Sequence, residues 1–198
     1  MSPQDMRQTL IARTIRVIAE EGLEKTTTKA IVAGTGINEA YIYRCFNGKE
    51  DLMAKAFAHL DNGLVEKILK HIPLMQMVDV PLKERWRLLF FAIWQYMLSG
   101  RDECLAYVRY YYSPHFLQDA FEEHHLRYKP VCDQMRPAFK EEANLWMILN
   151  HILSIMLNFA VRVHHGQMPN DDDYSDHVFR VIYTSITQYF KDNTESEA

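Results

Sequence analysis

The chain has 198 residues, of which 48% are hydrophobic and 24% are charged, and its formal net charge at pH 7 is −4. A chain of this length and composition can bury a sizeable core in one or two domains. Residues 1–60 carry eight Lys and Arg against seven Asp and Glu, whereas residues 61–198 carry fourteen against nineteen. The net negative charge argues against a protein that binds nucleic acid over most of its surface. It allows a small, locally basic DNA-binding region on an otherwise acidic protein.

Cysteine usage and hydropathy indicate a cytoplasmic protein. The three cysteines, Cys45, Cys104 and Cys132, are widely spaced and form no CxxC pair. Such cysteines are typical of free thiols in a reducing compartment. The first residues lack the pattern of a signal peptide, and polar residues interrupt the most apolar stretch, Leu145–Val163. We therefore expect no membrane span and no membrane partner.

The first quarter of the chain predicts short helices. Apolar residues recur at helical spacing from Asp5 to Glu21, and Gly22 follows as a stop. Thr26-Thr27-Thr28 supplies a hydroxyl cap for a short helix that extends through Ala33. Gly34-Thr35-Gly36 predicts a tight turn, Asn38 predicts a cap, and Glu39–Phe46 predicts a third helix. A fourth helix is expected to begin at Lys49.

The rest of the chain also follows the helical period. Two prolines in the segment Ile72–Pro81 indicate a connection, and Pro130 should kink or split the helix that contains it. With no convincing strand, the fold class expected is all-α with about nine helices. The later helices are expected at Leu82–Ser99, Asp102–Tyr112, Pro114–Met135, Pro137–His165 and Tyr174–Asp192.

Residues 28–49 have the pattern of a helix-turn-helix. Two short helices around a glycine turn meet its geometric requirement, in which the second helix presents side chains to base edges in the major groove. A small core can hold the two helices together, formed by Ala30, Ile31, Ile37, Ile42 and Phe46. The outer face of the second helix would carry Glu39, Ala40, Tyr41 and Arg44. The bare pattern is weakly specific, since any two short helices around glycine match it.

The surroundings of this motif add specificity. An amphipathic helix ending in Glu21-Gly22, the Thr26–Thr28 cluster, Ile42-Tyr-Arg-Cys-Phe46 and Lys49-Glu-Asp-Leu52 follow in a fixed order. Over about residues 8–60 the chain resembles the tetracycline-repressor (TetR-type) family of bacterial regulators. The remainder matches that family only in length and helical character.

The resemblance implies a DNA-binding repressor. Members are homodimers that read a palindromic operator and leave it when a small molecule binds the C-terminal domain. Carried over by position, the phosphate-contacting residues are Thr28, Lys29, Tyr43 and Lys49, and the base-reading residues are Glu39, Ala40, Tyr41 and Arg44. For Lys29 and Arg44, an ordinary solvated charge is an equally good interpretation.

Several positions depart from the family pattern. Ala40 replaces the usual glycine and favours helix, and Asn38 replaces the usual serine cap. Cys45 replaces a tyrosine or histidine, which removes a polar contact. Tyr41 is bulkier than the common threonine or serine, so the operator sequence does not follow from the resemblance.

The two last predicted helices carry more apolar residues than one buried face needs. In Pro137–His165 these residues lie on more than one face, and Tyr174–Asp192 repeats the situation. Two such helices from each chain would form a symmetric four-helix dimer interface. The alternative is that both are central core helices of a monomer.

Aromatic residues are dense in the middle of the chain. An aromatic stripe at helical spacing is usually core, but Trp, Tyr and Met also line adaptable pockets for apolar ligands. Such a pocket, for a flat or acyl-chain molecule, is predicted to involve Trp86, Phe90, Trp94, Tyr107, Tyr111, Trp146 and Asn150.

Metal, cofactor and enzyme chemistry find no support. The adjacent pairs His124-His125 and His164-His165 point about 100° apart on a helix, which is poor chelating geometry. No phosphate-binding, nucleophile or zinc motif occurs. We therefore expect a helix-turn-helix domain in residues 1–60 and a ligand-binding and dimerisation domain in residues 61–198. The alternative is an all-helical small-molecule-binding protein or enzyme that has lost DNA binding.

Overall fold

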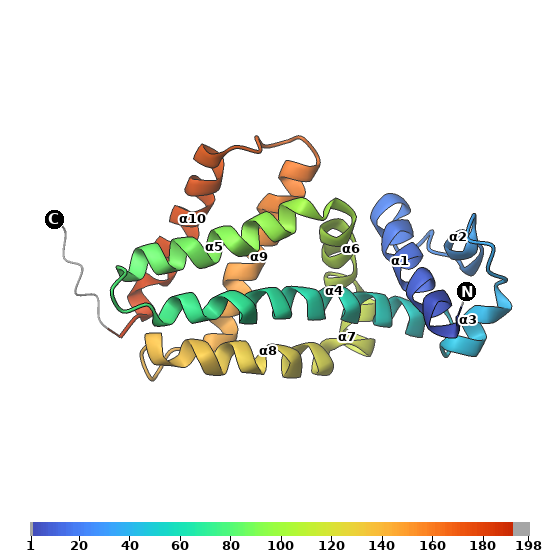
Figure 1. Ribbon diagram of the computed structural model, residues 1–198, viewed down its shortest axis with the longest axis horizontal. Helices are drawn as coiled ribbons and strands as arrows, with labels where there is room; N and C mark the ends of the chain where they lie inside the picture. The colour runs from blue at the N-terminus through green and yellow to red at the C-terminus, as the bar shows by residue number, and fades with distance from the viewer. Residues whose placement is uncertain (1, 192–198) are drawn as a thin grey trace. The chain divides into compact units, whose positions relative to one another are not determined.

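A computed structural model of the chain describes residues 2–191, except for the side chains of residues 118 and 119. Within that range the chain forms ten α-helices and three short 3-10 segments (η1–η3) and no strand, so the all-α prediction is confirmed (Figure 1). The helices are α1 Pro3–Glu21, α2 Thr28–Val32, α3 Ala40–Cys45, α4 Lys49–His71, α5 Leu82–Ser99, α6 Arg101–Tyr111, α7 Pro114–Asp119, α8 Phe121–Met135, α9 Leu145–His164 and α10 Asp172–Ile186; the 3-10 segments are η1 Ile72–Gln76, η2 Arg136–Ala138 and η3 Thr187–Tyr189.

The described residues divide into two compact units. The first unit consists of the residues up to 64 together with residues 100–127, and the second consists of residues 65–99 together with those from 128 onward. Helices α4 and α8 each begin in the first unit and end in the second.

The first unit is built from capped helices around an apolar core. Ser2 and Asp5 form a reciprocal capping box at the start of α1, and the Thr27 hydroxyl accepts a hydrogen bond from the Ala30 amide at the start of α2. Arg109 of α6 donates to the carbonyl of Ile18 on α1 at 2.7 Å. The completely buried side chains include Leu10, Ile31, Ile42 and Leu52. Helix caps and buried apolar side chains thus hold α1, α2 and α3 together in the first unit.

The second unit packs α5, α9 and α10 together. Trp94 on α5 is fully buried, and its indole N–H donates to the Ser175 hydroxyl on α10 at 2.9 Å. Arg87 and Asp176 join the same two helices through an ion pair of 2.9 Å. The buried indole N–H of Trp94 needs such an acceptor, so its hydrogen bond with Ser175 fixes how α10 lies along α5. The Arg87–Asp176 pair is exposed and contributes less.

Helix α9 is the one described helix that is long and apolar enough to cross a membrane. Over its most apolar stretch of 18 residues the mean hydropathy is 1.4, and 39% of that stretch is buried. The core helix of a water-soluble protein satisfies the same criterion, so this observation is weak evidence for a membrane.

The predicted start of the helix at Pro137 is wrong. The helix expected from Pro137 begins at Leu145, because Phe139 is extended and pairs with Phe190, and the Lys140 amide donates to the Tyr189 carbonyl at 2.8 Å. Asn144 then caps the new helix by accepting from the Met147 amide. Residues 138–140 therefore form hydrogen bonds with residues 188–191 instead of continuing a helix.

Pro130 does not split its helix. The expected Pro114–Met135 segment is divided at Ala120 instead, and α8 continues through Pro130. Proline removes the donor to the Leu126 carbonyl, but Leu126 is exposed, so water can satisfy that carbonyl.

Candidate nucleic-acid interface and effector cavity

The connection between α2 and α3 is a tight turn that requires glycine. Gly34 and Gly36 both have a φ of 74°, in the left-handed region that residues with a Cβ rarely adopt. Between them, the Thr35 hydroxyl and amide both donate to the Val32 carbonyl, at 2.8 and 3.0 Å. The predicted turn is therefore present, and it redirects the chain within three residues.

The apolar residues predicted as the core of the helix-turn-helix are buried or half-buried. Ile31 and Ile42 are completely buried and Phe46 is 4% exposed, whereas Ala30 and Ile37 are half-buried. The Asn38 side chain accepts from the Ala40 amide at 2.9 Å, as its predicted capping role requires.

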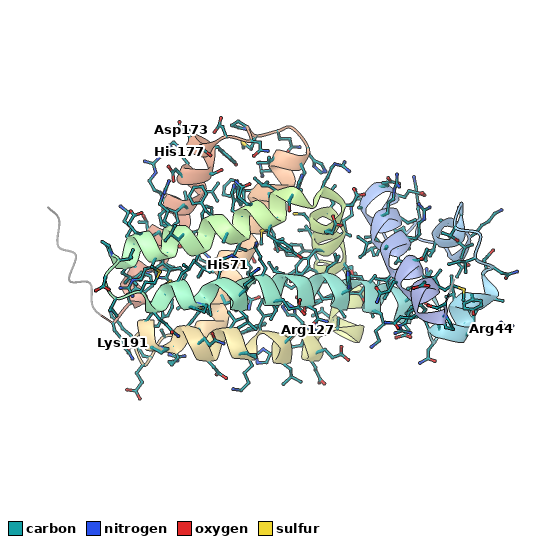
Figure 2. All side chains as sticks on the ribbon, in the orientation of Figure 1. Arg44, His71, Arg127, Asp173, His177 and Lys191 are labelled. Atoms are coloured by element: carbon teal, nitrogen blue, oxygen red, sulfur yellow. The ribbon has the colours of Figure 1, made fainter. Side chains whose placement is uncertain are left out.

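The predicted DNA-contacting residues all retain exposed surface. Lys29, Glu39, Ala40, Tyr43 and Arg44 are exposed. The remaining three, Thr28, Tyr41 and Lys49, are half-buried. The Tyr43 side chain is 66% exposed, so it is no core aromatic (Figure 2 labels its neighbour Arg44).

Contacts among these residues order the outer face. The Thr28 hydroxyl donates to the Glu39 carboxylate at 2.7 Å, which joins the first residue of α2 to the residue before α3. The Arg44 guanidinium lies 5.5 Å from the centre of the Tyr41 ring, within reach of a cation–π interaction. Lys49 lies 3.6 Å from the Glu50 carboxylate. Most of this face is held by short-range contacts.

Two arginines of α1 support this face, and the sequence analysis missed them. Arg7 donates to the Cys45 carbonyl at 2.6 Å, and its guanidinium lies 4.3 Å from the centre of the Phe46 ring. Arg13 donates to the Ala33 carbonyl at 3.1 Å. Both carbonyls lie at helix ends, where they lack a helical donor. Only the excess of arginine on the polar side of α1 could have indicated such roles.

A buried polar cluster lies in the first unit. The Asp61 carboxylate is completely buried, accepts from the Tyr107 hydroxyl at 3.0 Å, and lies 3.0 Å from the His124 ring nitrogen. Arg127 also donates to it, and Figure 2 shows Arg127 between α4 and α8. A buried carboxylate needs such partners. An aspartate among the apolar positions of α4 was the signal available in the sequence.

The placement of the histidines and cysteines in the described part of the chain bears on metal binding. No group of three or more potential ligands is placed to hold a metal ion there. The ring of His164 lies 3.0 Å from the Met97 carbonyl, and that of His151 lies 2.9 Å from the Ser185 hydroxyl. The three cysteines are free, and burial raises the pKa of the Cys104 thiol to about 12.

The second unit contains an apolar cavity of about 50 Å³. A single water needs roughly 10–15 Å³ of such volume, so the cavity can hold a small apolar group. No charged side chain lines it. Its walls come from α4, α5, α8, α9 and α10, and are formed by Ile68, Trp86, Leu89, Phe90, Ile93, Met135, Leu149, Ile152, Leu153, Met156, Phe179, Ile182, Tyr183 and Ile186.

The structure distributes the predicted ligand residues over both units. Trp86 and Phe90 line the cavity. Trp94, Trp146 and Asn150 belong to the same unit but not to that lining, and Asn150 donates to the Trp146 carbonyl. Tyr107 and Tyr111 belong to the first unit. Most of the lining is aliphatic, and the sequence analysis did not single it out because aliphatic residues on helices are usually core.

The exposed apolar residues of α9 and α10 are few. Met147 and Val181 are 54% and 53% exposed, while the three most regular apolar positions of α10, Val178, Ile182 and Ile186, are buried within the unit. Among the described large apolar residues of these two helices, Met147 and Val181 are the exposed ones.

These features define an all-helical protein with an N-terminal helix-turn-helix. Residues 10–56 match the family of bacterial regulatory proteins described as the tetR family. Over 68 residues the chain is 37% identical to the HTH-type nicotine-responsive transcriptional repressor HdnoR of Paenarthrobacter nicotinovorans. That match covers 34% of this chain and 35% of the relative, so it extends over about a third of each.

Solved structures share the fold over nearly the whole chain. A TetR family regulator of Marinobacter aquaeolei VT8 superposes with a TM-score of 0.73 at 15% identity, covering 93% of this chain and 98% of that one. A similar protein of Shewanella sp. PV-4 gives 0.74 at 15% identity, covering 90% and 96%. The sequence of residues 10–56 is thus similar to the tetR family, and the fold of the chain is similar to that of TetR family structures.

Proposed function

We propose that the protein is a DNA-binding transcriptional repressor of the TetR type. The observation that carries this proposal is the exposed polar face of α3, which follows a tight glycine turn and whose opposite side buries Ile42. An exposed helix of this kind, fixed by a tight turn, is what major-groove recognition requires. The repressor named among the relatives supports the same conclusion.

Each candidate residue has a role in this proposal. Thr28, Lys29, Tyr43 and Lys49 bind backbone phosphates and set the position of the head on DNA. Glu39, Ala40, Tyr41 and Arg44 face base edges and supply sequence preference. The Thr28–Glu39 hydrogen bond holds the acidic side chain in place until a base replaces that donor.

The remaining part of the proposal concerns residues 61–198. They form a homodimer, so that two heads read a palindromic operator, and they bind a small apolar or aromatic effector that releases the DNA. The cavity bounded by Trp86 and Phe90 is the site for its apolar part. The relative named nicotine-responsive and a similar structure from Saccharomonospora viridis in complex with choline, with a TM-score of 0.62, are consistent with a small-molecule signal. The protein acts in the cytoplasm and is not an enzyme.

A gel-shift with DNA from upstream of its own gene tests the DNA-binding role. The wild-type protein should retard one fragment at a concentration where unrelated DNA stays free. Lys49→Ala should weaken that complex, whereas Lys83→Ala should not, because Lys83 is an exposed lysine of α5 in the other unit. Equal binding to all fragments, unaltered in Lys49→Ala, favours the alternative, an all-helical ligand-binding protein or enzyme.

Sedimentation tests the dimer. The wild-type protein should sediment as a dimer at micromolar concentration, and Val181→Glu should give monomers, since it places a charge on the exposed apolar surface. Lys83→Glu is the matched control with an equal new carboxylate. A wild-type protein that sediments as a monomer would contradict the proposed dimer and, with it, the proposed palindromic operator.

A further inference from the structure

Two hollows of the second unit share part of their walls. One is the apolar cavity described above. The other is a wider groove of about 810 Å³, lined by residues 75–82 and by parts of α5, α8, η2 and α10. Met135 and Tyr183 line both hollows. On α5, Arg85 lines the groove and the next residue, Trp86, lines the cavity.

The groove has cationic character. Arg85 and Lys191 line it, against Asp79 as the one carboxylate among its lining residues. Figure 2 labels Lys191 near the C-terminal end of α8, whose residues Gln134 and Met135 line the same groove. An excess of one cation over the carboxylate favours a singly charged anion.

Arg85 is held in place and only partly satisfied. Its Nη1 donates to the Met75 carbonyl at 2.8 Å, which fixes the guanidinium against η1. Its Nε is buried and has no hydrogen-bond partner among the described residues. Because Arg85 lines the groove and a guanidinium has five N–H donors, a bound carboxylate can accept charge-assisted hydrogen bonds from it.

The cavity suits a hydrocarbon. Aliphatic, Met and aromatic side chains line it, and the methionine at its border with the groove, Met135, has three rotatable bonds and adapts its shape readily. A straight alkyl chain passing Met135 and Tyr183 would leave water on entering the cavity, which is favourable in proportion to its buried area.

From this arrangement we propose that the second unit binds a medium-chain amphiphilic carboxylate. The carboxylate pairs with Arg85, assisted by Lys191. The alkyl tail lies along the groove, and only its last carbons enter the cavity beside Trp86, between Met135 and Tyr183. This proposal names the chemical class of the effector and so rests on the proposed function for its regulatory role. Binding itself is independent of that role.

Calorimetry with the full-length protein and decanoate, below its micellar concentration, tests the binding site. Wild-type protein should bind decanoate at least ten times more tightly than decanol, and tryptophan fluorescence should change with either ligand. Arg85→Gln should lose at least ten-fold affinity for decanoate but keep its affinity for decanol. Lys191→Gln should show a smaller loss of the same kind, and Lys83→Gln should bind as wild type.

Several results would overturn the proposal. These are no binding of decanoate to the wild-type protein, equal binding of decanol and decanoate, or unchanged decanoate affinity in both Arg85→Gln and Lys191→Gln. The DNA-binding role is measured separately, by gel-shift without decanoate. If decanoate binds as expected but leaves the protein–DNA complex intact, the binding site stands and its effector role is wrong.

Discussion

The helix-turn-helix and the helices around the cavity direct their side chains in opposite ways. In α2 and α3, a few buried residues and a glycine turn leave nearly every polar side chain outside. In α5, α9 and α10, apolar side chains face inward and enclose a small volume. The first region can recognise a large polyanion on its surface, whereas the second can enclose part of a small apolar molecule. Under the proposed function, the first region would read DNA and the second would bind the effector.

The largest expected effect is the difference in Cys104 thiol reactivity between the native and the unfolded protein. With a pKa of about 12, Cys104 should be alkylated at pH 8 about 10³-fold more slowly in the native protein than in urea, where its pKa is about 8.5. Mass spectrometry of peptides labelled with iodoacetamide measures both rates. As pH rises from about 8.5 towards 12, the unfolded state loses this proton first, so stability should fall in that range. Rapid native labelling of Cys104 would show that its site opens readily.

Truncation of the Phe46 side chain should lower the stability of the helix-turn-helix unit strongly. Phe46→Ala removes a buried ring and its contact with the Arg7 guanidinium, so the free energy of unfolding should fall by about 3–5 kcal/mol. The matched control is Tyr43→Ala, which removes an exposed ring and should change it by less than about 0.5 kcal/mol. Urea unfolding followed by circular dichroism measures both. Similar losses in the two variants would mean that Tyr43 belongs to the core.

Neutralising Asp61 should have an intermediate effect. Asp61→Asn keeps the size of the side chain but removes the charge that faces Arg127 and His124, so stability should fall by about 1–3 kcal/mol. Asp133→Asn is the control, since Asp133 forms an exposed i,i+4 pair with Lys129. If the two substitutions cost the same, the buried cluster does not stabilise the first unit.

The smallest effect concerns the phosphate contacts. Lys49→Ala should lower the salt slope of DNA binding by about 1 and weaken all sequences about equally. Titrations by fluorescence anisotropy at several salt concentrations measure the slope, with Lys83→Ala as control. An unchanged slope would remove Lys49 from the interface.

The sequence predicts the helix-turn-helix better than the cavity of the second unit, for a physical reason. The turn at Gly34 and Gly36, the Thr27 cap and the start of α4 depend on residues a few positions apart, so local patterns determine them. The start of α9 depends on Phe139 pairing with Phe190, about fifty residues away. The cavity depends on which faces of five helices meet, which periodicity alone does not determine. Of the seven predicted ligand residues, Trp86 and Phe90 line it, and Arg85 of the neighbouring groove was not anticipated.

Selection of bound duplexes from a random DNA library, followed by sequencing, tests most directly whether α3 reads DNA. The wild-type protein should enrich one inverted repeat, because two identical heads read opposite strands. Tyr41→Ala and Arg44→Ala should enrich repeats that differ at defined positions, while Lys49→Ala should enrich the wild-type repeat more weakly. Enrichment of no sequence by the wild-type protein, or of the same repeat with equal affinity by both Tyr41→Ala and Arg44→Ala, would contradict the proposed reading face.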